Sequence, residues 1–510
     1  MNFLLALILG AASAFAFEPF ALWPLMPLAF AALCEFIARA PTLKRALLIG
    51  WGFCVGQFCV GLNWIATAFT FQAAMPAWLG WVAVVVLSFY LGLFMMLATG
   101  LAWRFGRTRK FALVLALGGG WAIAEWLRGT MFTGFAWNPV GVVLVDTPLL
   151  GTSTLIGTYG LSLLVVLSGG ALWLALRREL LHASAALALI GASALCASLA
   201  QPPLPTRTAR KPIRIVQPNI GQEDKWREGL ADEAFERLAK LSRGGGREPR
   251  LLLWPEVAVP EPFQILGIDQ RPLAVQLPAI PRAVQSIRSG DMLLTGAMAL
   301  VADGEGMIAG NTNSVFALDA GGRVLGRYDK AHLVPYGEYL PMRPILSAIG
   351  LSQLAPGQGD TTSGPGPRTL SLPDGWGKVG LQICYEIIFS GEVVDRADRP
   401  DFLFNPSNDA WFGAWGPPQH LAQARARAAE EGIPIIRSTP TGISAIVDSR
   451  GRLLRSIPWR AQGVIDDFLP PPLGGLTIFA RLGNIIPLAL AFLLLFAAIA
   501  LARGPRYRLT

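Results

Sequence analysis

The longest uncharged stretch of the chain runs from Ala46 to Trp103 and reads ALLIGWGFCVGQFCVGLNWIATAFTFQAAMPAWLGWVAVVVLSFYLGLFMMLATGLAW. A helix that spans a bilayer needs about 20 consecutive apolar residues, so this stretch is long enough for two spans with a turn near QAAMPAW. The whole chain is also apolar, because 53% of its 510 residues are hydrophobic and only 15% are charged. Such values lie outside the usual range of soluble proteins and predict a membrane protein.

Six further apolar runs qualify as candidate spans, which gives about eight in all. They cover residues 3–17, 22–38, 111–127, 155–176, 180–200 and 482–502. The first run ends in ASAFA and is also compatible with a cleaved signal peptide, although the basic segment that normally precedes such a peptide is missing. We therefore expect a multi-pass α-helical membrane domain over residues 1–200 and a last transmembrane helix at 482–502.

Basic residues predict the orientation of these spans. Lys and Arg follow the second, fourth, sixth and eighth runs, whereas the intervening loops are nearly free of them. The clusters are Arg39, Lys44 and Arg45; Arg104, Arg107, Arg109 and Lys110; Arg177 and Arg178; and Arg503, Arg506 and Arg508. Because cytoplasmic loops carry an excess of Lys and Arg, both termini, with the basic tail 503–510, are expected in the cytoplasm. The net charge of +9 is thereby explained without nucleic acid binding, which would favour one continuous basic surface.

The polar insert at 201–481 is then expected outside the cytoplasm, and its sequence is typical of a globular domain. Helical patterns at 229–242 and 417–431 lie between short runs rich in leucine or β-branched residues. The runs are IRIVQ, RLLLWP, DMLLTGAM, NSVFAL, KVGLQIC, DFLFNPS, IPIIRST and GISAIVD. Strands that are buried on both faces and alternate with helices predict an α/β domain.

Cys384 is the only one of the five cysteines that lies outside the long apolar runs, and it ends the predicted strand GLQIC. Reactive groups are often placed at the carboxyl ends of strands in α/β domains, although a structural buried thiol is the alternative. Glu256 follows the strand LLLWP, and Lys330 and Glu338 lie in YDKAHLVPYGEYLP. Taken singly, these charged residues are more simply surface residues. The three histidines are scattered, and no spacing predicts a metal site.

Together, Glu256, Lys330 and Cys384 resemble the Glu-Lys-Cys triad of the nitrilase superfamily. The motifs QPNIGQEDKW, LLLWPEVAVP, YDKAHLVPYGEYLP, LQICYEIIF and NPSNDAWFG occur in this order. They make the chain similar, over essentially its full length, to the apolipoprotein N-acyltransferase family, the membrane-embedded branch of that superfamily. The resemblance implies an extracytoplasmic, nitrilase-like αββα sandwich at 201–481, on the periplasmic side of a bacterial inner membrane, with no cofactor and no metal.

The resemblance also implies acyl transfer through a thioester on Cys384. A free thiol has a pKa of about 8.5, so a nucleophilic cysteine near neutral pH needs a base, and Glu256 is expected to be that base. Lys330 and a backbone N–H near Tyr385 would stabilise the oxyanion. The implied acyl donor is a membrane phospholipid. The implied acceptor is the α-amino group of the diacylglyceryl cysteine of an apolipoprotein.

Two further carboxylates are expected to support the triad. Glu338 would hold Lys330 in place, and Glu386 would stabilise the surroundings of Cys384, whereas ordinary loop ion pairs are the alternative for both. The motif EWLRG at Glu125 to Gly129 would lie at the outer end of the fifth span. It is compatible with an interfacial ion pair or with a contact to a phospholipid headgroup.

Aromatic and apolar residues near these motifs are candidates for contact with lipid. Trp226, Tyr385 and Trp411 are expected to line a substrate pocket, because aromatic walls suit a lipid-bearing substrate, but core packing is the alternative. The stretch 338–357 combines apolar residues with Pro and Gly. It is interpreted either as a lid that dips into the bilayer or as a packed helix.

Two other functions fit part of the sequence. A membrane-anchored amidase of the nitrilase type would form the same acyl thioester and release it to water, but such an enzyme has no evident need for eight spans. A transporter with an accessory domain would favour paired charges or broken helices at the membrane midplane, and the predicted spans contain neither. Acyl transfer between lipids accounts for more of the sequence, and lipoprotein maturation is the expected function.

Overall fold

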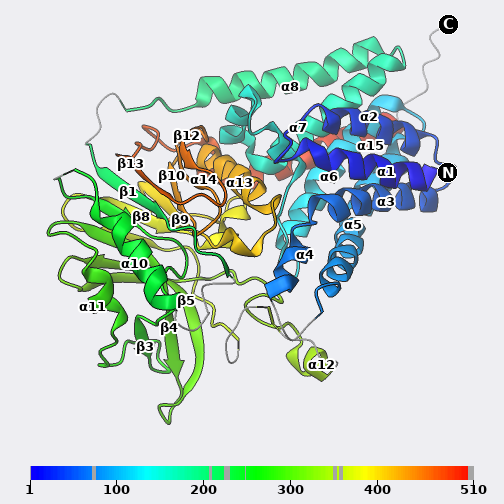
Figure 1. Cartoon of the computed structure of the whole chain (residues 1–510). Coiled ribbons are helices and arrows are strands. Elements are labelled where there is room, and N and C mark those ends of the chain that lie inside the picture. The colour runs from blue at the N-terminus through cyan, green and yellow to red at the C-terminus, as the bar shows by residue number, and fades with distance from the viewer. Residues whose placement is uncertain are drawn as a thin grey trace, which may run out of the picture.

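The computed structural model describes residues 2–71, 76–205, 210–222, 230–246, 248–348, 353–354 and 360–503. It consists of a helical part and a β-rich part that lie side by side (Figure 1). The apolar runs lie in the helical part, and the strands of the insert lie in the β-rich part.

The helical part contains one helix for each of the eight predicted runs. These helices are α1 (Asn2–Ser13), α2 (Leu25–Ala38), α3 (Leu43–Gly61), α5 (Leu79–Gly106), α6 (Lys110–Thr130), α7 (Ser153–Leu176), α8 (Leu180–Ala200) and α15 (Ile485–Arg503). Among the described residues, six helices are long and apolar enough to cross a membrane. The two others, α1 and α2, are apolar but have only 12 and 14 residues. The expectation of eight spans therefore remains a prediction for these two helices.

The helices α1 and α3 lie unusually close together. A Cβ atom added to Gly56 of α3 would lie 2.0 Å from the backbone oxygen of Leu7 in α1. A Cβ atom added to Gly10 of α1 would lie 1.7 Å from the backbone oxygen of Phe53 in α3. The helix α15, from the other end of the chain, lies against α6 and α7. The insert is thus anchored at both of its ends in one helix bundle.

The β-rich part is built from two sheets. The first has the order β13-β1-β2-β4-β5-β6, with β3 paired to β4, and the second has the order β12-β11-β10-β9-β8-β7. The first sheet comprises β1 (Pro212–Gln217), β2 (Leu251–Leu253), β3 (Gln264–Leu266), β4 (Met292–Ala302), β5 (Ile308–Asp319), β6 (Val324–Asp329) and β13 (Gly463–Phe468). The second comprises β7 (Thr369–Leu372), β8 (Gly377–Leu381), β9 (Phe402–Pro406), β10 (Ile435–Ser438), β11 (Ser444–Val447) and β12 (Leu453–Ile457). Each of the eight predicted strand runs forms a strand.

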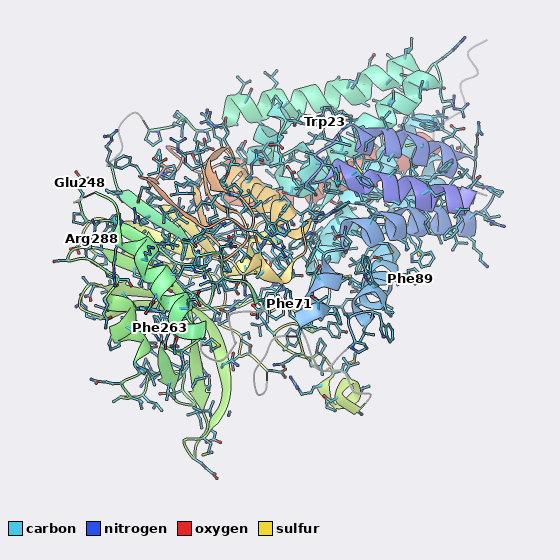
Figure 2. All side chains as sticks on the ribbon, in the orientation of Figure 1. Trp23, Phe71, Phe89, Glu248, Phe263 and Arg288 are labelled. Carbon is cyan, nitrogen blue, oxygen red and sulfur yellow. The ribbon has the colours of Figure 1, made fainter. Side chains whose placement is uncertain are left out.

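The alternation of side chains along the strands produces the layers. In β2, Leu251 and Leu253 belong to the core between the two sheets, whereas Leu252 packs with residues of α10 (Leu230–Arg243) and α11 (Ala279–Val284). The helix α13 (Gly416–Glu431) covers the second sheet. The four layers follow the order helix, sheet, sheet, helix, as the resemblance implies. Phe263 lies within the layer of α10 and β4 (Figure 2).

The outer face of α13 contacts the helical part (Figure 1). The indole N–H of Trp137 donates a hydrogen bond of 2.8 Å to Gln419 Oε1, and the backbone N–H of Thr158 donates one of 2.5 Å to Glu430 Oε1. Arg427 donates to Thr158 Oγ1 as well. One helix of the sandwich is therefore also a contact surface for the membrane helices.

Glu125 and Arg128 of the motif EWLRG are buried near this junction. Glu125 accepts hydrogen bonds from Trp121 Nε1 (3.0 Å) and from the backbone N–H of Val140 (2.8 Å). Arg128 donates to the backbone oxygens of Phe135 and Trp137, both at 2.9 Å. Both side chains are only 2% exposed, so they brace the connection between α6 and α7 inside the protein.

Candidate functional site

The three predicted triad residues come together where three strands end. Glu256 follows β2, Lys330 directly follows β6, and Cys384 follows β8. The Nζ atom of Lys330 lies 3.6 Å from Glu256 Oε1, and the charges of both groups act on the Cys384 thiol. Two strands belong to one sheet and the third to the other, so the site lies across the two sheets of the sandwich.

Both carboxylate oxygens of Glu256 are fixed by hydrogen bonds. Asn313 Nδ2 donates to Oε1 at 2.7 Å, and the backbone N–H of Asn408 donates to Oε2 at 2.6 Å. The same N–H lies close to the Cys384 sulfur, where it lowers the pKa of the thiol. The carboxylate is thereby held beside the thiol, and it is only 5% exposed.

Lys330 is buried between two carboxylates. Its Nζ atom lies 2.9 Å from Glu338, which also accepts a hydrogen bond of 3.0 Å from Asn313 Nδ2. Burial opposes the charged form, but the charges of Glu338 and Glu256 outweigh it and raise the pKa of Lys330 above its ordinary value. The ammonium is therefore kept charged in a buried site. Glu338 lies where the sequence predicts a residue that holds Lys330.

Cys384 is a buried thiol on a strained turn. Its backbone has a φ of +51°, in the left-handed region that residues other than glycine rarely adopt. Burial, and after it the charge of Glu256, raise the pKa of this thiol well above its ordinary value, whereas Lys330 opposes that effect. The resting thiol is consequently neutral and must transfer a proton before it can act as a nucleophile.

Glu386 joins the turn of Cys384 to the segment that follows Lys330. One of its oxygens accepts hydrogen bonds from Tyr328 Oη (2.8 Å) and from the backbone N–H groups of Ala331 (2.8 Å) and His332 (3.1 Å). The other accepts from the Ile383 N–H at 2.7 Å. Burial raises the pKa of Glu386, and these donors oppose that shift. The side chain thus fixes the relative position of Lys330 and Cys384.

The aromatic candidates lie at the junction of the two parts. Tyr385 is buried, and its hydroxyl donates a hydrogen bond of 3.3 Å to the Gly134 oxygen in the connection between α6 and α7. Trp411 packs edge-on against Phe71 with ring centroids 5.7 Å apart, where the helical part meets the sandwich (Figure 2). Trp226 lies outside the described residues.

The expected lid is only partly within the described chain. Its stretch 338–357 contains the short helix α12 (Arg343–Ala348), whereas residues 349–352 and 355–357 are outside the described ranges. Met342 and Ile345 are each 63% exposed. The described part thus includes a short helix, but none of the residues of that helix is buried, so it is not the packed helix of one interpretation. The lid of the other interpretation stays a prediction.

Several site residues are missing from the sequence-based prediction. Asn313 bridges Glu256 and Glu338, and a buried group of Asp409, His420 and Arg437 lies behind Cys384. Asp409 belongs to the motif NPSNDAWFG, but a motif does not say which side chain its residues contact. No group of three or more His, Cys, Asp or Glu side chains that could hold a metal ion occurs within the described ranges.

Comparison with known proteins gives matches over nearly the whole chain. The family model described as apolipoprotein N-acyltransferase N-terminal domain matches residues 9–171, and the carbon-nitrogen hydrolase model matches residues 213–470. The chain is 35% identical to apolipoprotein N-acyltransferase of Rhodopseudomonas palustris, covering 98% of this chain and 95% of the relative. It is 36% identical to the enzyme of the same name from Sinorhizobium medicae, covering 89% and 86%. Among solved structures, the chain is similar to Nit3 of Saccharomyces cerevisiae, a member of branch 10 of the nitrilase superfamily. The TM-score is 0.38 and the sequence identity is 16%, and the match covers 52% of this chain and 91% of Nit3.

Proposed function

The chain belongs to the apolipoprotein N-acyltransferase family, and we propose that it moves an acyl chain from a membrane phospholipid to the N-terminal amine of the diacylglyceryl cysteine of apolipoproteins. The observation that carries the proposal is the match over 98% of the chain, which includes the membrane helices as well as the sandwich. The family is one of N-acyltransferases within the carbon-nitrogen hydrolase superfamily. The phospholipid donor, the triad roles and the order of steps are our proposals.

In the first step, Glu256 takes the proton of the Cys384 thiol as the sulfur attacks the ester carbonyl carbon. The negative charge that develops on the carbonyl oxygen is stabilised by the Lys330 ammonium and by the N–H of Tyr385. When the intermediate collapses, the bond from carbon to the glycerol oxygen breaks and that oxygen takes the proton from Glu256. Lysophospholipid leaves, and the acyl chain remains as a thioester on Cys384.

In the second step, the amine of the diacylglyceryl cysteine attacks the thioester carbonyl. Glu256 accepts a proton from the amine, the carbon–sulfur bond breaks, and the sulfur is returned to the thiol form as Glu256 gives up the proton. The products are an amide and the original enzyme. This ping-pong order allows two bulky lipids to use one site in turn. The buried position of Glu256 beside both Lys330 and the thiol supports its part in each step.

We infer the following placement in the cell. The protein is a multi-pass protein of the bacterial inner membrane, with about eight spans, both termini in the cytoplasm and the sandwich on the periplasmic side. The proposed boundaries are 1–200 for the membrane domain, 201–481 for the catalytic domain, 482–502 for the last span and 503–510 for the tail. They are supported by the end of α8 at Ala200 and the start of α15 at Ile485, and by the distribution of basic residues.

The groups around the triad have supporting roles in this proposal. Glu338 holds Lys330, and Glu386 holds the turn of Cys384 against the segment after β6. Tyr385, Trp411 and Trp226 line the lipid pocket, and the segment 338–357 acts as a lid at the membrane surface. The exposed apolar side chains of α12 support the last role, because a helix of this kind favours an interface with lipid.

The proposal is tested by intact-protein mass spectrometry of the purified enzyme mixed with phospholipid in the absence of an acceptor. We expect a hydroxylamine-sensitive adduct of one acyl chain on the wild type, which a diacylglyceryl peptide then discharges. The adduct should be absent from Cys384→Ala. The matched control is Cys196→Ala, which removes an exposed thiol on α8 and should leave the adduct intact.

Other outcomes would reject parts of the proposal. A wild type that forms no adduct but hydrolyses a short amide would be an amidase rather than an acyltransferase. An adduct that persists in Cys384→Ala would exclude Cys384 as the nucleophile.

A further inference from the structure

A buried histidine holds the backbone carbonyl of the proposed nucleophile. The Nε2 atom of His420, on α13, lies 3.0 Å from the carbonyl oxygen of Cys384. Asn405 Nδ2 lies 3.5 Å from the same oxygen. The His420 side chain is 0% exposed and packs beside the rings of Trp137 and Phe412, whose centroids are 5.2 and 5.8 Å away. None of the steps described above uses this side chain.

The contacts of His420 require a hydrogen on its Nε2 atom. A carbonyl oxygen only accepts hydrogen bonds, so Nε2 must carry a hydrogen. Nδ1 lies 3.0 Å from Arg437 Nη2, which only donates. Nδ1 is also 3.0 Å from Asp409 Oδ1, and Arg437 Nη2 donates to that oxygen at 2.7 Å. Burial, and after it the charge of Arg437, lower the pKa of His420. Nε2 is therefore the donor to the Cys384 carbonyl, while Nδ1 faces both Asp409 and Arg437.

Fixing the carbonyl of Cys384 also fixes the N–H of Tyr385, because both belong to one planar peptide group. In a trans peptide the C=O and the N–H point in opposite directions. The carbonyl points toward α13, on the outer side of the second sheet. The N–H of Tyr385 thus points inward, toward the first sheet, from which Lys330 comes.

The Tyr385 N–H is also left without a role in the turn. The 3-10 turn η5 spans Cys384–Ile388, and its first backbone hydrogen bond is donated by the Glu386 N–H to the Ile383 oxygen. The Tyr385 N–H precedes the Glu386 N–H in the chain. Like the first N–H groups of any helix, it therefore has no acceptor within the turn. It is thus available for an oxygen atom in the site.

We propose that His420 is the positioning residue of the oxyanion site, because it holds the Cys384 carbonyl and so aims the Tyr385 N–H at the acyl oxygen beside Lys330. This inference rests on the proposed acyl transfer. His420 exchanges no proton in either step. It stabilises the left-handed conformation of Cys384 and the direction of one N–H before substrate binds.

The test compares two reactions of the same thiol. Acylation of Cys384 builds negative charge on a carbonyl oxygen. In the reaction with methyl methanethiosulfonate, by contrast, the sulfur displaces methanesulfinate and forms a mixed disulfide, so no carbonyl oxygen gains charge. Single-turnover rates of both reactions are measured by mass spectrometry, with phospholipid and, separately, with p-nitrophenyl butyrate as the acyl donors.

The variants differ in whether they can donate to the Cys384 carbonyl. His420→Phe fills the space of the ring among Trp137 and Phe412 but has no donor, and His420→Asn is a second variant that is too short to place its amide at the position of Nε2. His420→Gln can place an amide N–H there. The matched control is His182→Phe on α8, where His182 stacks on Phe111 at 4.9 Å.

We expect His420→Phe and His420→Asn to slow acylation by at least about tenfold, toward the roughly 10²–10³-fold loss caused by removing one oxyanion donor. Their reaction with methyl methanethiosulfonate should stay near the wild-type rate. His420→Gln should restore most of the acylation rate, and His182→Phe should match the wild type in both reactions.

The inference is overturned if acylation is unchanged in His420→Phe and His420→Asn. It is also overturned if both reactions slow in parallel in these variants, because His420 would then merely hold the thiol in place. A wild type that is acylated by the p-nitrophenyl ester but not by phospholipid would reject the proposed function alone, and the ester series would still decide the role of His420. A wild type acylated by neither, with a reactive thiol, would reject both.

Discussion

At the scale of single residues, the site combines a neutral buried thiol with two opposite charges. Glu256 raises the pKa of Cys384 and Lys330 lowers it, yet the proposed mechanism needs both groups. Glu256 is needed as the proton acceptor, although its charge disfavours the thiolate. Lys330 is needed to stabilise the negative charge on the oxygen of the intermediate. Ground-state ionisation of Cys384 and its reactivity toward an ester are therefore separate properties.

This separation can be measured with Glu256→Gln and Lys330→Met. Removal of the negative charge should move the pH midpoint for methyl methanethiosulfonate labelling of Cys384 to lower pH, and removal of the positive charge should move it to higher pH. Glu256→Gln should nevertheless lose roughly 10²–10⁴-fold in acylation rate, the usual contribution of a general base. Lys330→Met should also lose acylation.

The matched control is Glu305→Gln, at an exposed position of the turn between β4 and β5. It should keep the wild-type midpoint and the wild-type acylation rate. A higher midpoint in Glu256→Gln would mean that this carboxylate stabilises the thiolate, which is the opposite of the repulsion expected between two negative charges.

The resemblance of the motifs pointed to Glu256, Lys330 and Cys384, each of which comes soon after a strand, and the structure brings these three residues together. Their catalytic roles remain proposals. The sequence was insufficient for Asn313 and His420. Their roles depend on partners 57 and 36 positions away in the chain, and such pairings are created by the packing of sheets and helices. A polar residue in a strand or on a helix carries no local signal of its distant partner.

At the scale of elements, the contact of α1 with α3 depends on the absence of side chains. Gly56→Ala should lower the free energy of unfolding by about 1–3 kcal/mol, the typical cost of overpacking, because the new Cβ would lie 2.0 Å from a backbone oxygen of α1. The measurement is thermal unfolding in detergent, with the change in melting temperature as the readout.

The control for this substitution is Gly191→Ala on α8, where an added Cβ meets nothing within 4 Å. Alanine is the better helix former by about 1 kcal/mol, so this variant should be as stable as the wild type or slightly more stable. Equal melting temperatures for Gly56→Ala and Gly191→Ala would contradict the tight packing of α1 on α3.

The strands in the middle of each sheet were predictable, whereas those at the edges were harder to predict. β9 is buried throughout and begins with three consecutive hydrophobic residues, but β12 is an edge strand in which four of five residues are exposed. A strand that is exposed on both faces has no need of an apolar pattern, so its sequence resembles a loop. The helix α12 has no buried residue among those described and is ambiguous for the same reason.

At the scale of the whole molecule, α13 joins the catalytic sandwich to the membrane helices. Its sequence, GPPQHLAQARARAAEE, has the polar composition of a solvated helix, yet Gln419, Arg427 and Glu430 are buried. They bind groups of the helical part. The division into two domains could be predicted from composition, but their contact could not, because polar residues at an interface look the same in sequence as polar residues in water.

Removal of one charge at this contact should destabilise the molecule. Glu430 accepts hydrogen bonds from Thr158 (2.5 Å) and Ser390 (2.8 Å) and lies 2.6 Å from Arg427 Nε. Glu430→Ala should cost about 3–5 kcal/mol in the free energy of unfolding, because it leaves Arg427 buried without its counterion. The readout is again thermal unfolding in detergent.

The control is Glu233→Ala, which removes an exposed partner of Arg237 on α10 and should change the free energy of unfolding by less than about 1 kcal/mol. If Glu430→Ala unfolded at the same temperature as this control, the junction would contribute little to stability.

The position of α15 bears on how the protein is made. This helix is the last one among the described residues, yet it lies against α6 and α7, which are synthesised more than 300 residues earlier. With the proposed topology, the whole sandwich must cross the membrane before α15 enters the bilayer. The surface of α6 and α7 that receives α15 must therefore be covered by something other than α15 during synthesis, and insertion of α15 is the event that completes the bundle after translocation.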